Sequence, residues 1–150
     1  MALFDVISED IKKAMIAKDK VALEALRGVK KEFLEAKTAK GASGELADDA
    51  ALKILQKMVK QRKESAQIFT EQNRPELAQN ELAEAAVIEK YLPAKLSDAE
   101  LEAEIEAIIA EVGAKTAQEM GKVMGVATKK LAGKADGKEI SAKVKALLNS

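Results

Sequence analysis

The sequence predicts an all-helical protein, and three observations lead to this fold class. Apolar residues recur three and four positions apart along most of the chain, as on one face of an α-helix. Capping patterns, glycines and prolines separate these apolar stripes. No window alternates strongly enough between apolar and polar residues to indicate a strand. We therefore expect an all-α fold with an N-terminal four-helix bundle followed by a smaller three-helix C-terminal domain.

Four amphipathic helices account for the first part of the chain. The second follows Asp19 as its N-cap, and the fourth opens at Pro75, where the missing N–H of proline costs little. Pro93 stops the fourth helix because proline cannot continue a helix, and the segment 41–44 is expected as a turn. The first three helices are expected at about residues 3–17, 20–39 and 48–71. Short connections between the four favour an antiparallel bundle.

Capping boxes open the three helices of the last third. In such a box a short polar side chain caps the helix while a glutamate three residues later reaches back to it. The boxes are Ser97–Glu100, Thr116–Glu119 and Asp136–Glu139. Gly113 and Gly133 are expected to end the first two of these helices. The boundary falls in the segment that contains Pro93, so we expect domains at residues 1–95 and 96–150.

The composition excludes several kinds of catalytic site. The chain has no Cys and no His, which excludes a disulfide, a thiolate nucleophile, a His-based triad and His or Cys metal ligands. The glutamates at 100–106 have a spacing of two, which scatters them around a helix instead of bringing them together. We expect no catalytic residues, no metal and no cofactor, and hence no enzymatic activity from this chain alone.

Location and partners are constrained by charge and hydropathy. No apolar run approaches the length of about 18 residues that a membrane-spanning helix needs. Acidic residues near the N-terminus fit neither a secretory signal nor a transit peptide. The chain has 25 basic and 25 acidic residues, so no global field steers it towards a polyanion. We expect a cytoplasmic protein without a membrane or DNA partner, in which any polyanion contact comes from a local patch.

The last third contains such a patch of positive charge. Between Gly113 and Ser150 there are eight lysines and three acidic residues. Two glycines lie inside the expected helix of this region, at a cost of about 1 kcal/mol each relative to alanine, so something should approach them closely. A neighbouring helix is the commoner cause, and a nucleic-acid backbone between lysines is the alternative. The candidate RNA-binding residues are Gly121, Lys122, Gly125, Lys129, Lys130, Lys134 and Lys138.

Two basic residues of the third helix are candidates for a secondary ligand contact or a structural role. Arg62 occupies a position in an apolar series where an apolar residue is expected. It either pairs with a carboxylate such as Glu81 or Glu84, which we favour, or presents its guanidinium to a ligand. Lys60 belongs to a stripe of lysines on the same helix, for which a solvated face is the simpler explanation.

A series of short motifs extends over essentially the whole chain. They are Ala14-Met15, Lys18-Asp19, Leu26-Arg27, residues 55–65, Tyr91-Leu92-Pro93, residues 121–125 and residues 133–136. In this order the motifs resemble the YqeY-type family of small bacterial proteins. The resemblance implies a helical N-terminal bundle and a three-helix C-terminal domain. One departure is Gly28, where a larger apolar residue would be usual and which should weaken the second helix.

The C-terminal motifs also resemble the tail domain of the B subunit of the tRNA-dependent amidotransferase and a module appended to some glutaminyl-tRNA synthetases. That resemblance implies a grip on tRNA outside the catalytic centre and supplies no active site. The residues that carry it are Gly121, Lys122, Gly125, Lys129, Lys130 and Lys134. We therefore expect a non-catalytic helical module that binds tRNA or a tRNA-modifying or aminoacylating enzyme.

Two alternatives to this function stay open. One is a protein-interaction module that docks on an aminoacylation or amidation complex, which net neutrality and scarce aromatic residues favour. The other is an accessory part of a carbon–nitrogen ligase that takes glutamine as amido-N-donor. That activity would require other subunits, because this chain has no residues for the chemistry.

Overall fold

The computed structural model describes residues 2–39, 41 and 44–149, and this part of the chain forms helices and no strand. The helices are α1 (Leu3–Ala17), α2 (Lys20–Thr38), α3 (Asp48–Glu71), α4 (Pro75–Glu89), α5 (Asp98–Val112), the 3-10 helix η1 (Ala117–Glu119), α6 (Met120–Lys130) and α7 (Gly137–Leu148). The all-helical fold class is therefore confirmed. The turn predicted at 41–44 lies partly outside the described residues.

The chain divides into two compact units. Unit 1 is Met1–Leu92 and contains α1 to α4, and unit 2 is Pro93–Ser150 and contains α5, η1, α6 and α7. The division falls directly before Pro93, whereas the sequence placed it after residue 95. Each unit has a hydrophobic core of its own, so the fold of each follows from its own apolar stripes.

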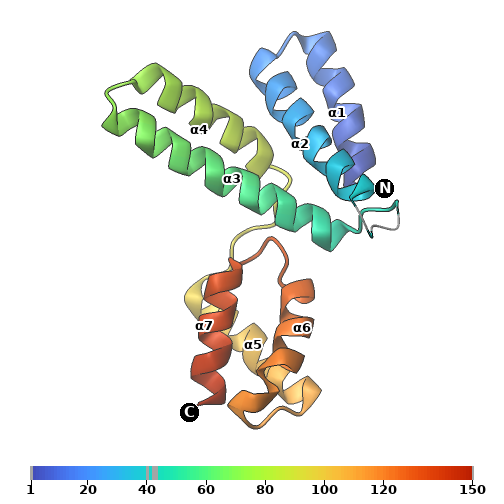
Figure 1. Cartoon of the computed structure of the whole chain (residues 1–150), viewed down its shortest axis with the longest axis vertical. Coiled ribbons are helices and arrows are strands. Elements are labelled where there is room, and N and C mark those ends of the chain that lie inside the picture. The colour runs from blue at the N-terminus through green and yellow to red at the C-terminus, as the bar shows by residue number, and fades with distance from the viewer. Residues whose placement is uncertain (1, 40, 42–43, 150) are drawn as a thin grey trace. The chain divides into compact units, whose positions relative to one another are not determined.

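Unit 1 consists of two helical hairpins, α1–α2 and α3–α4. The helices of each hairpin lie side by side, and the two hairpins diverge towards their turns (Figure 1). The hairpins meet mainly through α2 and α4. The antiparallel bundle expected from the short connections is therefore only partly realised, because one end of each hairpin extends beyond the shared core. That core contains Ile7, Leu26, Val29, Phe33, Leu55, Val59 and Ile88.

Local caps explain where the helices of unit 1 begin and end. The Asp19 carboxylate accepts a hydrogen bond from the Ala22 N–H at 3.1 Å, which confirms the predicted N-cap of α2. Lys18, which ends α1, has a left-handed backbone with φ of 58°. Pro75 is the first residue of α4, as predicted, but α4 ends at Glu89, before Pro93 is reached.

Unit 2 packs α5, α6 and α7 around an entirely aliphatic core. Its buried members include Leu101, Ile105, Ile108, Val123, Ala127, Leu131, Ile140 and Val144. The Leu96 N–H donates to the Lys134 carbonyl at 2.9 Å and so holds the start of the unit against the connection between α6 and α7. Gly113 ends α5 in the left-handed conformation, with φ of 72°, as the sequence predicted.

The three predicted capping boxes behave differently. At Ser97 the box is complete, since its hydroxyl accepts from the Glu100 N–H at 3.2 Å and the Glu100 carboxylate accepts from the Ser97 N–H at 3.1 Å. Thr116 caps no backbone N–H, so the prediction of a second capping box is wrong. The chain instead passes through η1, and the Glu119 carboxylate accepts from the Lys115 N–H at 3.3 Å.

The ends of α6 and α7 also differ from the prediction in detail. Helix α6 ends at Lys130, before Gly133, which has a φ of 77° within the following turn. Asp136 caps α7, but its carboxylate accepts from the Lys138 N–H at 3.4 Å, one residue earlier than in a capping box. The connection between the two helices is therefore a compact turn with buried alanines and not an extended loop.

Candidate nucleic-acid interface

Helix α6 has one buried face and one exposed face. Val123 and Ala127 are fully buried against the other helices of unit 2. The exposed face carries Gly121, Lys122, Gly125 and Lys129. At 3.6 residues per turn the two glycines lie next to each other on this face, with the two lysines along one side of them. Four of the candidate RNA-binding residues therefore share one exposed helix face.

The space in front of the two glycines is open. A Cβ atom added at Gly121 or at Gly125 would meet no described atom within 4 Å outside its own helix. No helix of unit 2 therefore requires these glycines, and the expectation of a neighbouring helix is wrong within this unit. The physical reason is that α6 packs through Val123 and Ala127, whose side of the helix points away from the glycines. Nothing within unit 2 accounts for the helix-weakening glycines, and the backbone of a ligand is the alternative cause.

The candidate lysines fall into two groups. Lys130 Nζ lies 2.6 Å from Glu111 Oε2, so its charge is balanced within the chain. In the described part of the chain, no ion pair or hydrogen bond engages the side-chain ammonium group of Lys122, Lys129, Lys134 or Lys138. All four of these lysines are exposed. The sequence offered no way to separate the two groups, because Glu111 is nineteen positions away from Lys130.

The four lysines without an ion-pair partner lie on α6, in the turn after it and at the start of α7. Lys122 and Lys129 are seven residues apart on α6, about 10.5 Å along the helix axis. Lys134 follows in the turn, and Lys138 is in the first turn of α7. Asp136 occupies the N-cap of α7, so an anion at that helix end would meet a carboxylate. Within the predicted site, the exposed face of α6 is therefore more favourable for an anion than the start of α7.

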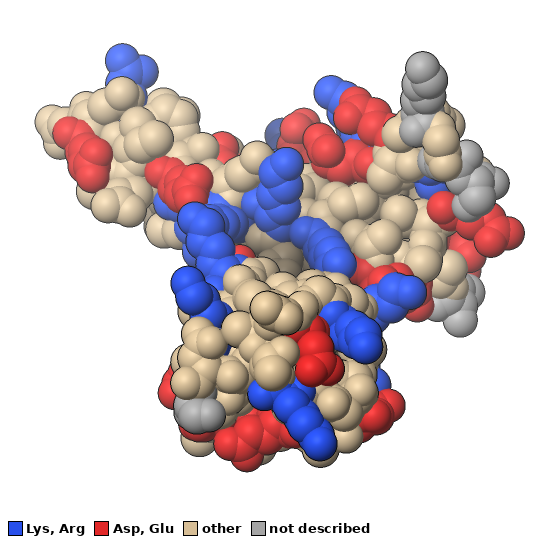
Figure 2. Space-filling model, turned by 60° about the horizontal axis from the view of Figure 1, so that its bottom comes forward, with Lys and Arg blue, Asp and Glu red and all other residues tan. Residues whose placement is uncertain are grey.

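The surface charge of unit 2 is mixed. Figure 2 shows basic and acidic side chains close to one another on the visible face of this unit, with uncharged surface between them. Two further lysines are paired, with Lys143 Nζ 2.9 Å from Asp98 Oδ1 and Lys95 Nζ 3.1 Å from Glu139 Oε1. The excess of lysines in the sequence therefore overstates the charge that is available to a ligand.

In unit 1, Arg62 contacts both carboxylates considered for it. Its Nη1 lies 2.8 Å from Glu84 Oε2 and 3.3 Å from Glu81 Oε2. The Glu84 side chain is buried, and this desolvation raises its pKa, as do the negative charges of Glu81 and Glu24, while Arg62 opposes the rise. Arg62 thus neutralises a carboxylate that would otherwise be costly to bury.

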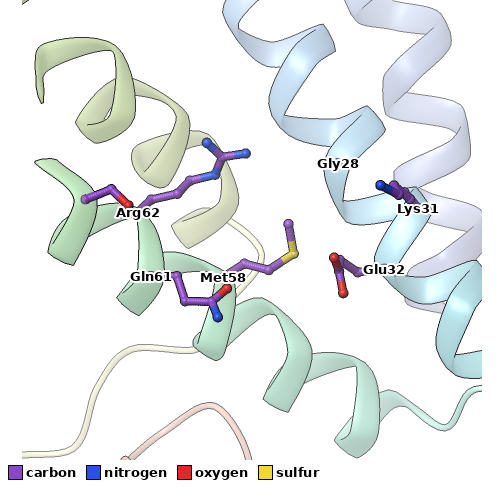
Figure 3. A pocket seen from close by; sticks show the side chains of 7 residues that line it. Gly28, Lys31, Glu32, Met58, Gln61 and Arg62 are labelled. Carbon is purple, nitrogen blue, oxygen red and sulfur yellow. The ribbon is translucent and has the colours of Figure 1, made fainter. Parts of the chain in front are cut away.

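A hollow of about 290 Å³ lies between α2 and α3 beside Arg62. Figure 3 shows Met58 and Arg62 extending from α3 towards α2, where Gly28 leaves room for them. A Cβ at Gly28 would lie 3.6 Å from Arg62 Nη2 and 3.8 Å from Met58 Cε. Gly28 therefore faces neighbouring side chains at ordinary contact distance, unlike Gly121 and Gly125. The hollow is lined by Gly28, Lys31, Glu32, Met58, Gln61, Arg62 and Ser65. Lys60 is exposed and is not part of this lining.

The described part of the chain lacks two features, a cluster of metal ligands and a membrane-spanning helix. No group of three or more carboxylates in that part of the chain is arranged to hold a metal ion. None of the described helices is both long and apolar enough to cross a membrane.

Known proteins similar to this chain point to one family. The family model described as Yqey-like protein matches residues 4–148. Three curated relatives are fungal proteins named altered inheritance of mitochondria protein 41, mitochondrial. The relative from Clavispora lusitaniae is 37% identical over 91 residues, which are 61% of this chain and 52% of that protein. The relative from Meyerozyma guilliermondii is 40% identical over 94 residues, 61% of this chain and 47% of that protein.

The relative from Lachancea thermotolerans is 35% identical over 104 residues, 65% of this chain and 52% of that protein. The chain thus spans about half the length of the curated relatives it matches. The names of these relatives refer to mitochondria, whereas the sequence suggested a bacterial, cytoplasmic protein, and that location stays a prediction. Because the family model covers nearly the whole chain, the protein belongs to the Yqey-like family.

Proposed function

We propose that unit 2 is a non-catalytic module that contacts the phosphate backbone of tRNA, alone or in complex with an aminoacylating or tRNA-modifying enzyme. The observation that carries the proposal is the exposed face of α6. Gly121 and Gly125 have open space in front of them, and Lys122 and Lys129 beside them have no ion-pair partner in the described part of the chain. Without a Cβ at these positions, a phosphate can come close to the helix while two ammonium groups neutralise it.

The residue types in unit 2 favour contact with the backbone over reading of bases. All three arginines and all four aromatic residues of the chain lie before Pro93. Bidentate recognition of a base edge usually uses Arg, and unpaired bases stack on aromatic rings or guanidinium planes. Lysine supplies a point charge instead. We therefore expect affinity for the shape and charge of a folded RNA, with little dependence on its sequence.

The test is a binding titration of purified tRNA with the full chain over a range of salt concentrations. Four phosphate contacts predict that affinity falls about 100-fold between roughly 50 and 200 mM salt. Binding that is absent at the lower salt concentration would contradict the proposal. Binding with a much smaller salt slope would mean that fewer lysines touch phosphate than the structure offers.

A protein-docking module is the second candidate, and exposed apolar side chains on α4 favour it. Leu77 and Leu82 have 41% and 49% of their surface exposed in unit 1. A partner protein could cover these two side chains. Capture of an aminoacylating enzyme in the absence of RNA, without binding to tRNA, would support this candidate. A role in glutamine-dependent amide transfer is tested separately, by measuring glutamine turnover when the candidate partner subunits are added.

A further inference from the structure

The last turn of α1 carries the most exposed large apolar side chain among the described residues. Ile16 has 84% of its surface exposed, and Met15 beside it has 53% exposed. On α1, Ile16 lies opposite Ile7 and Ala14, which are buried in the core of unit 1. Ile16 therefore cannot join that core without turning the helix over.

Lysines surround this apolar pair. Lys12 and Lys13 are four and three residues before Ile16, which makes them its neighbours on the helix surface. Lys18 and Lys20 follow in the turn, and all four lysines are exposed. The four lysines and the apolar pair, Met15 and Ile16, are called the basic tip below.

Four acidic residues lie in or next to this segment. Glu9 and Glu24 are exposed, three or four residues from a lysine of the tip, whereas Asp10 and Asp19 make contacts within the fold. The Asp19 carboxylate caps α2 through the Ala22 N–H at 3.1 Å. Asp10 accepts a hydrogen bond from the Tyr91 hydroxyl at 2.5 Å and also lies 3.9 Å from Lys13 Nζ. Both carboxylates are thus held by backbone or tyrosine contacts at the base of the turn. Residues 12–20 themselves contain four lysines and one acidic residue, so positive charge is in excess directly around the exposed apolar pair.

The α3–α4 hairpin provides a contrast. Ile68 is also exposed, with 51% of its surface accessible. Its neighbours four residues before and three residues after are Glu64 and Glu71. The two hairpins therefore present an exposed isoleucine in opposite electrostatic surroundings, one basic and one acidic.

We infer that the basic tip docks on an anionic lipid surface, with Ile16 and Met15 entering the boundary between headgroups and acyl chains and the lysines contacting lipid phosphates. Charge complementarity selects this occupant, because an apolar side chain ringed by lysines matches a surface that is apolar inside and negative outside. The turn projects from the rest of unit 1, which suits insertion from one end (Figure 1). RNA has no apolar layer to receive Ile16, so the RNA proposal for unit 2 does not explain it.

This inference revises the expectation that the chain has no membrane partner. That expectation rested on the lack of a spanning segment and on the neutral net charge. Neither argument applies to a local tip of six residues that rests on a surface without crossing it. The inference is also independent of the proposed contact between unit 2 and tRNA.

Sedimentation with lipid vesicles tests the basic tip. The full chain is mixed with phosphatidylcholine vesicles that contain about one-third phosphatidylglycerol or none, at about 100 mM salt. We expect binding to the anionic vesicles and at least tenfold weaker binding to the neutral ones. Ile16→Glu should weaken anionic binding about tenfold or more, because it removes the apolar contact and adds a negative charge. Replacing Lys12 and Lys13 by Gln should weaken it about 25-fold, at about fivefold for each lysine near the surface.

Matched variants keep the test specific. Ile68→Glu changes a similarly exposed isoleucine on the other hairpin and should leave vesicle binding unchanged. Lys122→Glu with Lys129→Glu should weaken vesicle binding less than the changes at Lys12 and Lys13 do, which separates the lipid site from the proposed RNA site. Circular dichroism of each variant checks that the helices are intact. The inference is overturned if the unmodified chain does not bind anionic vesicles, which would favour a protein groove as the occupant, or if Ile16→Glu and Ile68→Glu have the same effect.

Discussion

In unit 1 the guanidinium of Arg62 is held between the carboxylates of Glu84 and Glu81, whereas in unit 2 Lys122 and Lys129 stand on an exposed helix face without an ion-pair partner in the described chain. The first arrangement compensates for the burial of a carboxylate and so serves the fold. The second arrangement makes no ion pair that would stabilise the fold, so its two positive charges are available to a ligand. The comparison teaches that the neighbouring side chains decide whether a basic residue stabilises the fold or is available for binding.

The glycines of the two units differ in the same way. A Cβ at Gly28 would make ordinary van der Waals contact with Arg62 and Met58, so this glycine faces packed side chains of unit 1. Gly121 and Gly125 face open space. Their cost to helix stability is therefore not offset by any contact in the described structure, as is expected where a ligand is the missing neighbour.

The largest expected effect comes from charge reversal in unit 2. Replacing Lys122, Lys129, Lys134 and Lys138 by Glu should reduce tRNA affinity by at least 100-fold at about 50 mM salt, since all four phosphate contacts are lost. The melting temperature should barely change, because exposed substitutions usually cost less than about 0.5 kcal/mol. Lys53→Glu with Lys57→Glu on unit 1 is the matched control and should leave binding within a few-fold. Equal losses for both variants would show only a general charge effect.

Arg62→Leu should give the largest loss of stability. The change leaves the buried Glu84 carboxylate near Glu81 and Glu24 without its cation, which should cost about 1–3 kcal/mol in urea-induced unfolding. Adding Glu84→Leu to that variant should recover part of the loss, because an apolar pair can replace a buried ion pair. An unchanged or higher melting temperature for Arg62→Leu would assign Arg62 to a ligand in the adjacent hollow.

Substitution of the exposed glycines of α6 should have opposite effects on stability and on tRNA binding. Gly121→Ala and Gly125→Ala should each raise stability by about 1 kcal/mol, since a Cβ meets no described atom and alanine favours the helix. The same changes should weaken tRNA binding several-fold if a phosphate backbone approaches that face. Gly28→Ala, in ordinary contact with its neighbours, is the control and should leave tRNA binding alone. Higher stability with unaltered binding would separate the glycines from the RNA proposal.

The smallest expected effect concerns the bond between Tyr91 and Asp10. This hydrogen bond of 2.5 Å joins residues 81 positions apart and connects the end of α4 to α1. Tyr91→Phe should cost about 1 kcal/mol of unfolding free energy, because Asp10 remains partly exposed and can be solvated. Binding of tRNA should not change. A loss of affinity without a loss of stability would mean that unit 1 takes part in recognition.

Sequence reasoning found the elements that depend on neighbouring residues. Asp19 caps α2, Pro75 opens α4 and the box at Ser97 is complete, since each needs partners only two or three residues away. The box at Thr116 failed although it has the same pattern, because the chain enters a 3-10 turn there and Glu119 binds the Lys115 N–H instead. The grouping of Gly121, Lys122, Gly125 and Lys129 on one face also followed from local periodicity alone.

Pairings between distant residues could not be read in this way. The sequence named Glu81 and Glu84 as possible partners of Arg62 because Arg62 interrupts an apolar series of its helix. It did not indicate that Glu111 would neutralise Lys130, or that Asp10 would be bound by Tyr91. These contacts depend on how the helices are rotated and tilted against each other, and no short motif encodes that.

The sequence by itself determined the helices, most of their ends, the residues on each helix face and the absence of Cys and His chemistry. Only the tertiary structure decided which charges are paired, that no described helix fills the space at Gly121 and Gly125, and that Ile16 lies outside the core. The physical reason is the distance along the chain over which each interaction acts. Helix formation and capping depend on residues within about four positions, whereas burial and ion pairing depend on the side of each helix that its neighbours cover.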